Sequence, residues 1–133
     1  MSAFLADANV LIALLVPTHE HHDAAERWMT TLADDDAVAS DPVTEGAFVR
    51  YAVRVGYPAG HAQRILEHVH SAKRWEFWGR GMSYADVDLR AVRGHRQVTD
   101  AYLVSLARSH GGILTTFDQP LAARFPTDVV RID

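Results

Sequence analysis

Residues 98–118, VTDAYLVSLARSHGGILTTFD, indicate how this chain folds. Residues 98–110 are apolar on nearly every side, which is typical of a helix buried among other elements. Gly111 and Gly112 follow, as glycine often does after the last turn of a helix. Residues 113–116 form a short strand that ends beside Asp118. The stretch therefore predicts a buried helix that leads into a strand, the repeating unit of an α/β domain.

The same alternation continues on both sides of this stretch. Ser40, Asp41 and Pro42 form a helix start, because proline suits the first helical position and serine or aspartate caps it. Thr18 can cap an earlier helix. We expect strands at residues 3–6, 37–39, 75–78, 113–116 and 129–132, the third of these at an edge of the sheet. We expect helices at residues 10–15, 18–32, 42–55, 59–72, 85–92 and 98–110, a loop at 94–97, and one helical turn at 120–124. The pattern predicts a three-layer α/β/α sandwich with a mainly parallel central sheet.

Length and composition limit the class of protein. The chain has 133 residues, so we expect a single domain spanning residues 1–133. Hydrophobic residues make up 48% and charged residues 23%, which argues against disorder. The longest wholly apolar run, residues 10–16, is far too short to span a membrane. The absence of cysteine excludes disulfides, thiolate zinc sites and cysteine nucleophiles. We expect a cytoplasmic protein without membrane association.

The charge is unevenly distributed. The net charge is −4, yet residues 50–108 hold ten of the thirteen Lys and Arg residues against five acids. That segment carries +5 and the remainder −9. A basic surface beside an acidic pocket suits a metal-dependent nuclease, in which cations hold phosphates and carboxylates hold metal. The alternative is a solvated surface of mixed charge.

Three acids are expected at one edge of the sheet. Asp7 follows the first strand, Glu45 lies early in the helix after the second, and Asp118 follows the strand at 113–116. Ligands of parallel sheets bind beyond the carboxyl ends of the strands, where these acids converge. Asp100 opens a helix that precedes its strand, so the same rule leaves its position open.

Clustered carboxylates require a compensating charge. Two unit charges 4 Å apart repel by roughly 4 kcal/mol at an effective dielectric constant of 20. Oxygen ligands suit Mg²⁺ and Mn²⁺, which activate water for attack on a phosphodiester. For each acid taken alone, a helix cap or a surface charge is the competing interpretation.

Four short motifs resemble those of PIN domains, and most closely the VapC toxins of bacterial toxin–antitoxin pairs. They are LADANVL at residues 5–11, TEGAFVR at 44–50, VTDAYL at 98–103 and TTFD at 115–118. Each is weak alone, but the ordered set at family-like spacing is specific.

The resemblance implies an endoribonuclease of PIN-like fold that leaves a 3′-hydroxyl and a 5′-phosphate. It implies that Asp7, Glu45, Asp100 and Asp118 are the catalytic acids and bind Mg²⁺, with Mn²⁺ as a substitute. It also implies that Asn9 and Thr116 orient the carboxylates or water on the metal. The implied partners are an RNA substrate, a cognate antitoxin protein and a second copy of the chain. Residues 10–16 and the tryptophan-rich segment are candidate surfaces for such a homodimer.

Four arginines are candidates for binding RNA phosphates. Arg50 and Arg54 are four residues apart on one helix face, and Arg93 and Arg96 precede Asp100. Arg96 is favoured by its proximity to Asp100 in sequence. The alternative for each is a solvated side chain.

Two other functions remain open. A non-catalytic RNA-binding or partner-binding module on the same fold would not need the acids. A phosphoryl-transfer hydrolase or receiver domain would also place an Asp after the first strand, but Lys73, the only lysine, is not near the acids in sequence. A zinc site is not expected from His19, His21 and His22, because they do not form the His-Glu-x-x-His pattern, in which the two ligands lie one helical turn apart.

Overall fold

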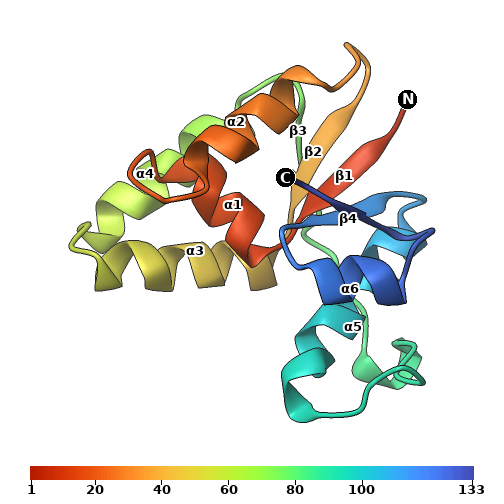
Figure 1. The fold of residues 1–133 in the computed structure, drawn as a ribbon. Helices are drawn as coiled ribbons and strands as arrows, with labels where there is room; N and C mark the ends of the chain where they lie inside the picture. Colours follow the sequence, from red (N-terminus) through yellow and green to blue (C-terminus); the bar gives the residue numbers. More distant parts are fainter.

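Five parallel strands form the centre of the computed structural model, which describes residues 1–133 (Figure 1). The strands are β1 (Ala3–Ala6), β2 (Ala37–Ser40), β3 (Trp75–Phe77), β4 (Ile113–Thr116) and β5 (Val129–Arg131). Their order in the sheet is β3-β2-β1-β4-β5, and every neighbouring pair is parallel. Leu5 of β1 pairs with Ala39 on one side and Leu114 on the other. The first strand is therefore central, and β3 lies at an edge as the sequence predicts.

Helices cover both faces of this sheet. They are α1 (Ala8–Leu15), α2 (His22–Thr30), α3 (Pro42–Arg54), α4 (Ala59–His70), α5 (Val98–Ser109) and α6 (Gln119–Arg124), with 3₁₀ turns η1 (Tyr84–Asp86) and η2 (His95–Gln97). Helices α1 to α4 gather on one side of the sheet, and α5 and α6 on the other (Figure 1). One buried cluster joins α1, α3 and α4 around Phe48, and another joins α5 and α6 to the sheet through Leu106 and Leu121. The predicted three-layer α/β/α architecture is confirmed.

Aspartates begin the helices that follow three of the strands. Asp7, Asp41 and Asp118 are the N-caps of α1, α3 and α6, and each accepts a hydrogen bond from a backbone N–H three residues on. At Asp41 a reciprocal bond from its own N–H to Thr44 completes a capping box. Because β1, β2 and β4 are parallel, these helix starts lie at one edge of the sheet.

Two of the predicted helices differ from the structure. The helix expected at 85–92 is wrong, since only the 3₁₀ turn η1 forms there. The Asp88 N–H donates to Ser105 Oγ of α5, and its carboxylate accepts from Arg90, which holds the segment in an irregular path. The predicted cap Thr18 is also wrong: α2 begins only at His22. The expected loop at 94–97 contains the 3₁₀ turn η2.

The apolar run at 10–16 is mostly internal. Val10, Leu11, Ile12, Ala13 and Val16 are buried in the chain's own core. The prediction that this run supplies a dimer surface is therefore wrong for those five side chains. No helix combines the length and the apolar character that crossing a membrane requires.

Candidate active site

Asp7 is the most buried of the four predicted site acids. The residue is 8% exposed at the point where β1 passes into α1. Oδ1 accepts the Val10 N–H, and Oδ2 accepts the hydroxyl of Thr116. Burial, with a smaller contribution from the charges of Asp100 and Asp118, raises the pKa of Asp7 from 3.8 to about 6. An ionised Asp7 is thus held in an environment that disfavours its charge.

Asp100 lies in the first turn of α5 and has no protein partner. No hydrogen bond or ion pair engages its half-buried carboxylate. Burial and the charge of Asp118 raise the pKa of Asp100, whereas the charge of Arg124 lowers it. The irregular segment before α5 therefore returns Asp100 to the edge that holds Asp7 and Asp118, which the sheet rule alone left open.

Glu45 occupies a separate position at this edge. Its Oε2 accepts bonds from Ser40 Oγ at 2.7 Å and from His70 Nε2 at 2.6 Å. Trp75 Nε1 donates in turn to Ser40 Oγ at 3.0 Å. Glu45 is not among the charges that shift the pKa of Asp7 or Asp100. The structure thus brings three of the acids into electrostatic contact and holds the fourth through Ser40 and His70.

The oxygen atoms at the site fit a hard divalent cation in kind, but they are not arranged around one. No three Asp, Glu or His side chains lie close enough together to hold a metal ion. Caps and hydrogen bonds occupy both oxygens of Asp7, Oδ1 of Asp118 and Oε2 of Glu45. Both oxygens of Asp100, Oδ2 of Asp118 and Oε1 of Glu45 accept no hydrogen bond from the protein and remain available.

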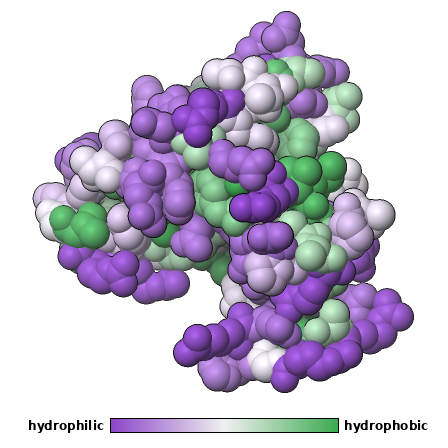
Figure 2. Space-filling view, in the orientation of Figure 1, coloured by the Kyte–Doolittle hydropathy of each residue, from purple (hydrophilic) through white to green (hydrophobic).

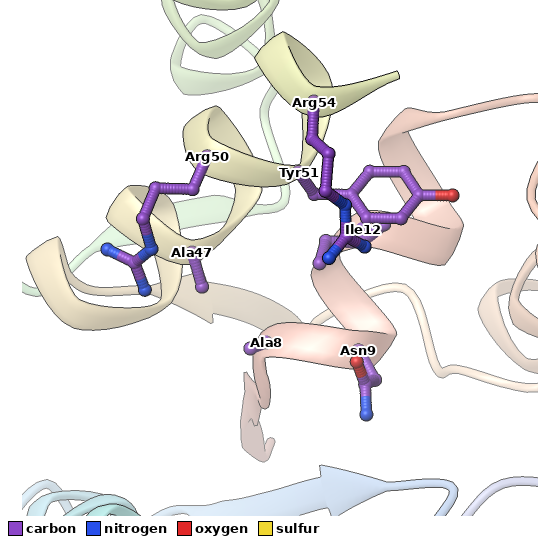
Figure 3. Close-up of a pocket in the computed structure, with 7 residues that line it drawn as sticks. All are labelled: Ala8, Asn9, Ile12, Ala47, Arg50, Tyr51 and Arg54. Carbon is purple, nitrogen blue, oxygen red and sulfur yellow. The ribbon is translucent and has the colours of Figure 1, made fainter.

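The predicted arginines fall into two groups. Arg50 and Arg54 line a cleft of about 420 Å³ between α1 and α3, together with Asn9 and Tyr51 (Figure 3). The Arg54 guanidinium lies over the Tyr51 ring at 5.3 Å. Arg93 donates to the carbonyl oxygens of Arg90 and Val92, and Arg96 is exposed without a partner. Figure 2 shows the surface hollowed between the part that carries α3 and the part that carries α5.

Sequence reasoning missed three residues at this edge. Arg124, rather than Arg93 or Arg96, is the cation that acts on Asp100. Arg124 lies in the helix that starts after Asp118, and this position in the sequence could have predicted that it lies near the acids. His70 and Ser40 bind Glu45, but nothing in their sequence spacing points to that contact.

The family model for the PIN domain matches residues 4–124. The chain is also 51% identical over 118 residues to ribonuclease VapC29 of Mycobacterium tuberculosis, covering 89% of this chain and 87% of that protein. This chain belongs to the PIN domain family. Ribonuclease VapC39 of the same organism is 37% identical and is covered to 97%. The resemblance of the four sequence motifs to PIN domains of the VapC type is confirmed.

Solved structures share the fold of this PIN domain. VapBC2 from Rickettsia felis, bound to a DNA fragment from its promoter, matches with a TM-score of 0.68 and 16% identity over 98% of this chain and 99% of that one. VapC20 of M. tuberculosis, described as a sarcin–ricin loop cleaving toxin, matches with a TM-score of 0.68 and 12% identity over 92% and 95%. At these identities the matches establish the fold.

Proposed function

We propose that this PIN domain is a metal-dependent endoribonuclease, the toxin of a type II toxin–antitoxin pair, with Asp7, Glu45, Asp100 and Asp118 as its metal-binding acids. The observation that carries the proposal is the meeting of Asp7, Asp100 and Asp118. Besides burial, the charges of Asp100 and Asp118 raise the pKa of Asp7, and the charge of Asp118 raises the pKa of Asp100. Asp100 is half buried and has no protein partner. Such a group of acids is explained by a cation that binds them.

The relatives support the reaction. VapC29, VapC39 and VapC44 of M. tuberculosis are named ribonucleases, and this chain matches most of the length of each. PIN-domain ribonucleases in general depend on divalent metal. Because the donors here are all carboxylate oxygens, we assign Mg²⁺ to this chain, with Mn²⁺ able to replace it.

The chain's own residues have distinct roles in this proposal. The four acids would hold a divalent ion, which would supply water activation and charge stabilisation at the scissile phosphate. Thr116 fixes the rotamer of Asp7 by its hydrogen bond, and Asn9 extends the polar surface at the start of α1. Arg50 and Arg54 bind phosphates along α3, and the exposed Arg93 and Arg96 do so beside α5.

Two protein partners accompany the RNA substrate. Among the structural neighbours are a toxin–antitoxin complex from Klebsiella pneumoniae and the VapBC2 assembly of R. felis. On the basis of these assemblies, we propose that a cognate antitoxin binds this chain. We also propose that the chain forms a homodimer.

RNA cleavage by purified protein tests the function. Asp7→Asn and Asp100→Asn should each abolish cleavage in Mg²⁺, as should excess EDTA on the wild type. Asp23→Asn, which changes an exposed acid in the first turn of α2, is the matched control and should cleave normally. Full activity of either site variant, or of the wild type in EDTA, refutes the proposal.

A thermal shift distinguishes the non-catalytic alternative. A metal that binds only the folded state raises the melting temperature. Mg²⁺ or Mn²⁺ should therefore stabilise the wild type and Asp23→Asn but not Asp100→Asn. If neither metal changes the melting temperature of the wild type, the result favours a non-catalytic binding module.

A further inference from the structure

The loop between α1 and α2 places two histidine rings against aromatic residues from distant parts of the chain. His19 lies 5.8 Å from Tyr51 of α3 and 5.6 Å from His21, measured between ring centroids. His21 lies 4.8 Å from Phe117, tilted by 31°. Tyr51, His19, His21 and Phe117 thus form a row of neighbouring rings, which we call the aromatic strip.

The strip has electropositive groups at one end and the acids at the other. Tyr51 lines the cleft that also contains Arg50 and Arg54, and the Arg54 guanidinium lies over its ring. Phe117 stands between Thr116, which binds Asp7, and Asp118. An RNA strand that lies along the strip would therefore contact the arginines first, then the aromatic rings, and then the candidate metal-binding acids.

Hydrogen bonding keeps His19 in a form suited to stacking. Nδ1 of His19 accepts the backbone N–H of His21 at 3.0 Å, so this nitrogen carries no proton and the ring is neutral. Burial is the main cause of the lowered pKa of His19, and this shift also favours the neutral ring. His21 is exposed, and His19, Tyr51 and Phe117 are half-buried, so the strip is open to solvent on one side. Tyr51 and Phe117 also pack against the core.

A zinc site does not account for this arrangement. The strip has only two histidines, and one nitrogen of His19 is already used by the loop backbone. His22, the third histidine of the loop, turns away to bind the Ala13 carbonyl oxygen at 2.7 Å and Glu26 at 3.0 Å.

We propose that the aromatic strip stacks the unpaired bases of a single-stranded RNA segment, while Arg50 and Arg54 hold its phosphates, so that the strand is led to the acids. Aromatic rings stack on bases whose faces are free, and paired bases in an A-form duplex have no free faces. The strip would therefore bind only a stretch of RNA whose bases are unpaired. This inference rests on the proposed ribonuclease function and deepens it.

Equilibrium binding in the full-length protein tests the strip. The Asp100→Asn background prevents cleavage, and fluorescence anisotropy reports the affinity for a labelled single-stranded RNA and for its duplex. His21→Ala should weaken single-strand binding by about tenfold, the size expected for loss of one stacking contact. His21→Phe keeps a stacking ring and should retain the affinity. His68→Ala, an exposed histidine on α4, is the control.

The outcomes separate this inference from the function on which it rests. Binding of the duplex should be weaker than that of the single strand and insensitive to His21→Ala. Tyr51→Ala is a second variant at the far end of the strip. A Mn²⁺ thermal shift, measured for each substitution with Asp100 intact, shows that the variant folds and binds metal. If both variants bind single-stranded RNA like the background protein, or if duplex is preferred, the strip is not a base-stacking surface. Cleavage by the wild type would then still support the ribonuclease function, whereas a wild type that neither binds nor cleaves RNA overturns both.

Discussion

The Thr116 hydroxyl donates a hydrogen bond to Oδ2 of Asp7 over 2.5 Å, joining the end of β4 to the start of α1. The hydroxyl oxygen of Thr116 also accepts the Asp118 N–H at 3.0 Å, so the hydroxyl proton remains free to point at Asp7. Thr116 thereby orients one acid and the backbone of another.

Thr116→Val should weaken metal binding and cleavage. Valine has nearly the same shape but no hydroxyl, so one oxygen of Asp7 loses its donor. Loss of such a partner of a metal ligand typically reduces metal affinity or activity by about 10- to 100-fold. Titration with Mn²⁺ measures the effect. Thr115→Val is the matched control, since Thr115 binds the Leu5 carbonyl oxygen instead; equal losses in both variants would contradict a specific role for Thr116.

Asp7→Asn should stabilise the metal-free protein at neutral pH. The folded-state pKa of about 6 lies above the ordinary 3.8, so the folded state binds the proton more tightly and ionisation destabilises it as pH rises through this interval. The destabilisation is complete above pH 6 and is on the order of 1–3 kcal/mol. Urea unfolding in EDTA should therefore show a more stable variant at pH 7.5 and no such advantage at pH 4. A variant that is less stable than the wild type at both values would show that burial does not penalise the charge of Asp7.

His70→Ala should loosen Glu45. The imidazole is one of two donors to Glu45 Oε2, and the other, Ser40, is itself held by Trp75. With His70 gone, the carboxylate gains rotational freedom, and Mn²⁺ affinity should fall several-fold while the protein remains folded. His68→Ala, two residues earlier on α4, controls for the loss of a histidine. Unchanged affinity would mean that the contact between His70 and Glu45 has no role in metal binding.

Arg124→Ala should raise the pKa of Asp100 further. Arg124 is the cation that lowers it, against the burial and the Asp118 charge that raise it. NMR titration of the Asp100 side-chain carboxyl carbon in metal-free protein measures the change, with Arg131→Ala of β5 as the control. An unaltered Asp100 titration would show that Arg124 does not act on this site.

The layers of the fold could be predicted from the sequence because its signals are local. Apolar residues 98–110 before two glycines predict α5, and Asp41–Pro42 predicts the start of α3. The helix predicted at residues 85–92 is wrong, because the contacts of Asp88 with Ser105 and Arg90 determine the path of this segment. Ser105 lies seventeen positions from Asp88 in the sequence. Contacts of that kind are not visible in local periodicity.

The candidate site could be predicted in part. The sheet rule predicts that Asp7, Glu45 and Asp118 lie at one edge of the sheet, and the motif resemblance adds Asp100. The contact between His70 and Glu45 joins α4 to α3 over twenty-five positions, and the tilted ring contact between His21 and Phe117 joins two loops. Both depend on how the helices pack, which neither composition nor spacing encodes.

Anomalous scattering from crystals soaked in MnCl₂ tests the central claim most directly. If Asp7, Glu45, Asp100 and Asp118 gather around divalent cations, the anomalous map should show a manganese peak within about 2.2 Å of oxygens from at least three of them. The same soak of Asp100→Asn crystals should weaken or remove that peak. A wild-type map with no peak at this edge of the sheet, or with manganese bound only elsewhere, would contradict the account.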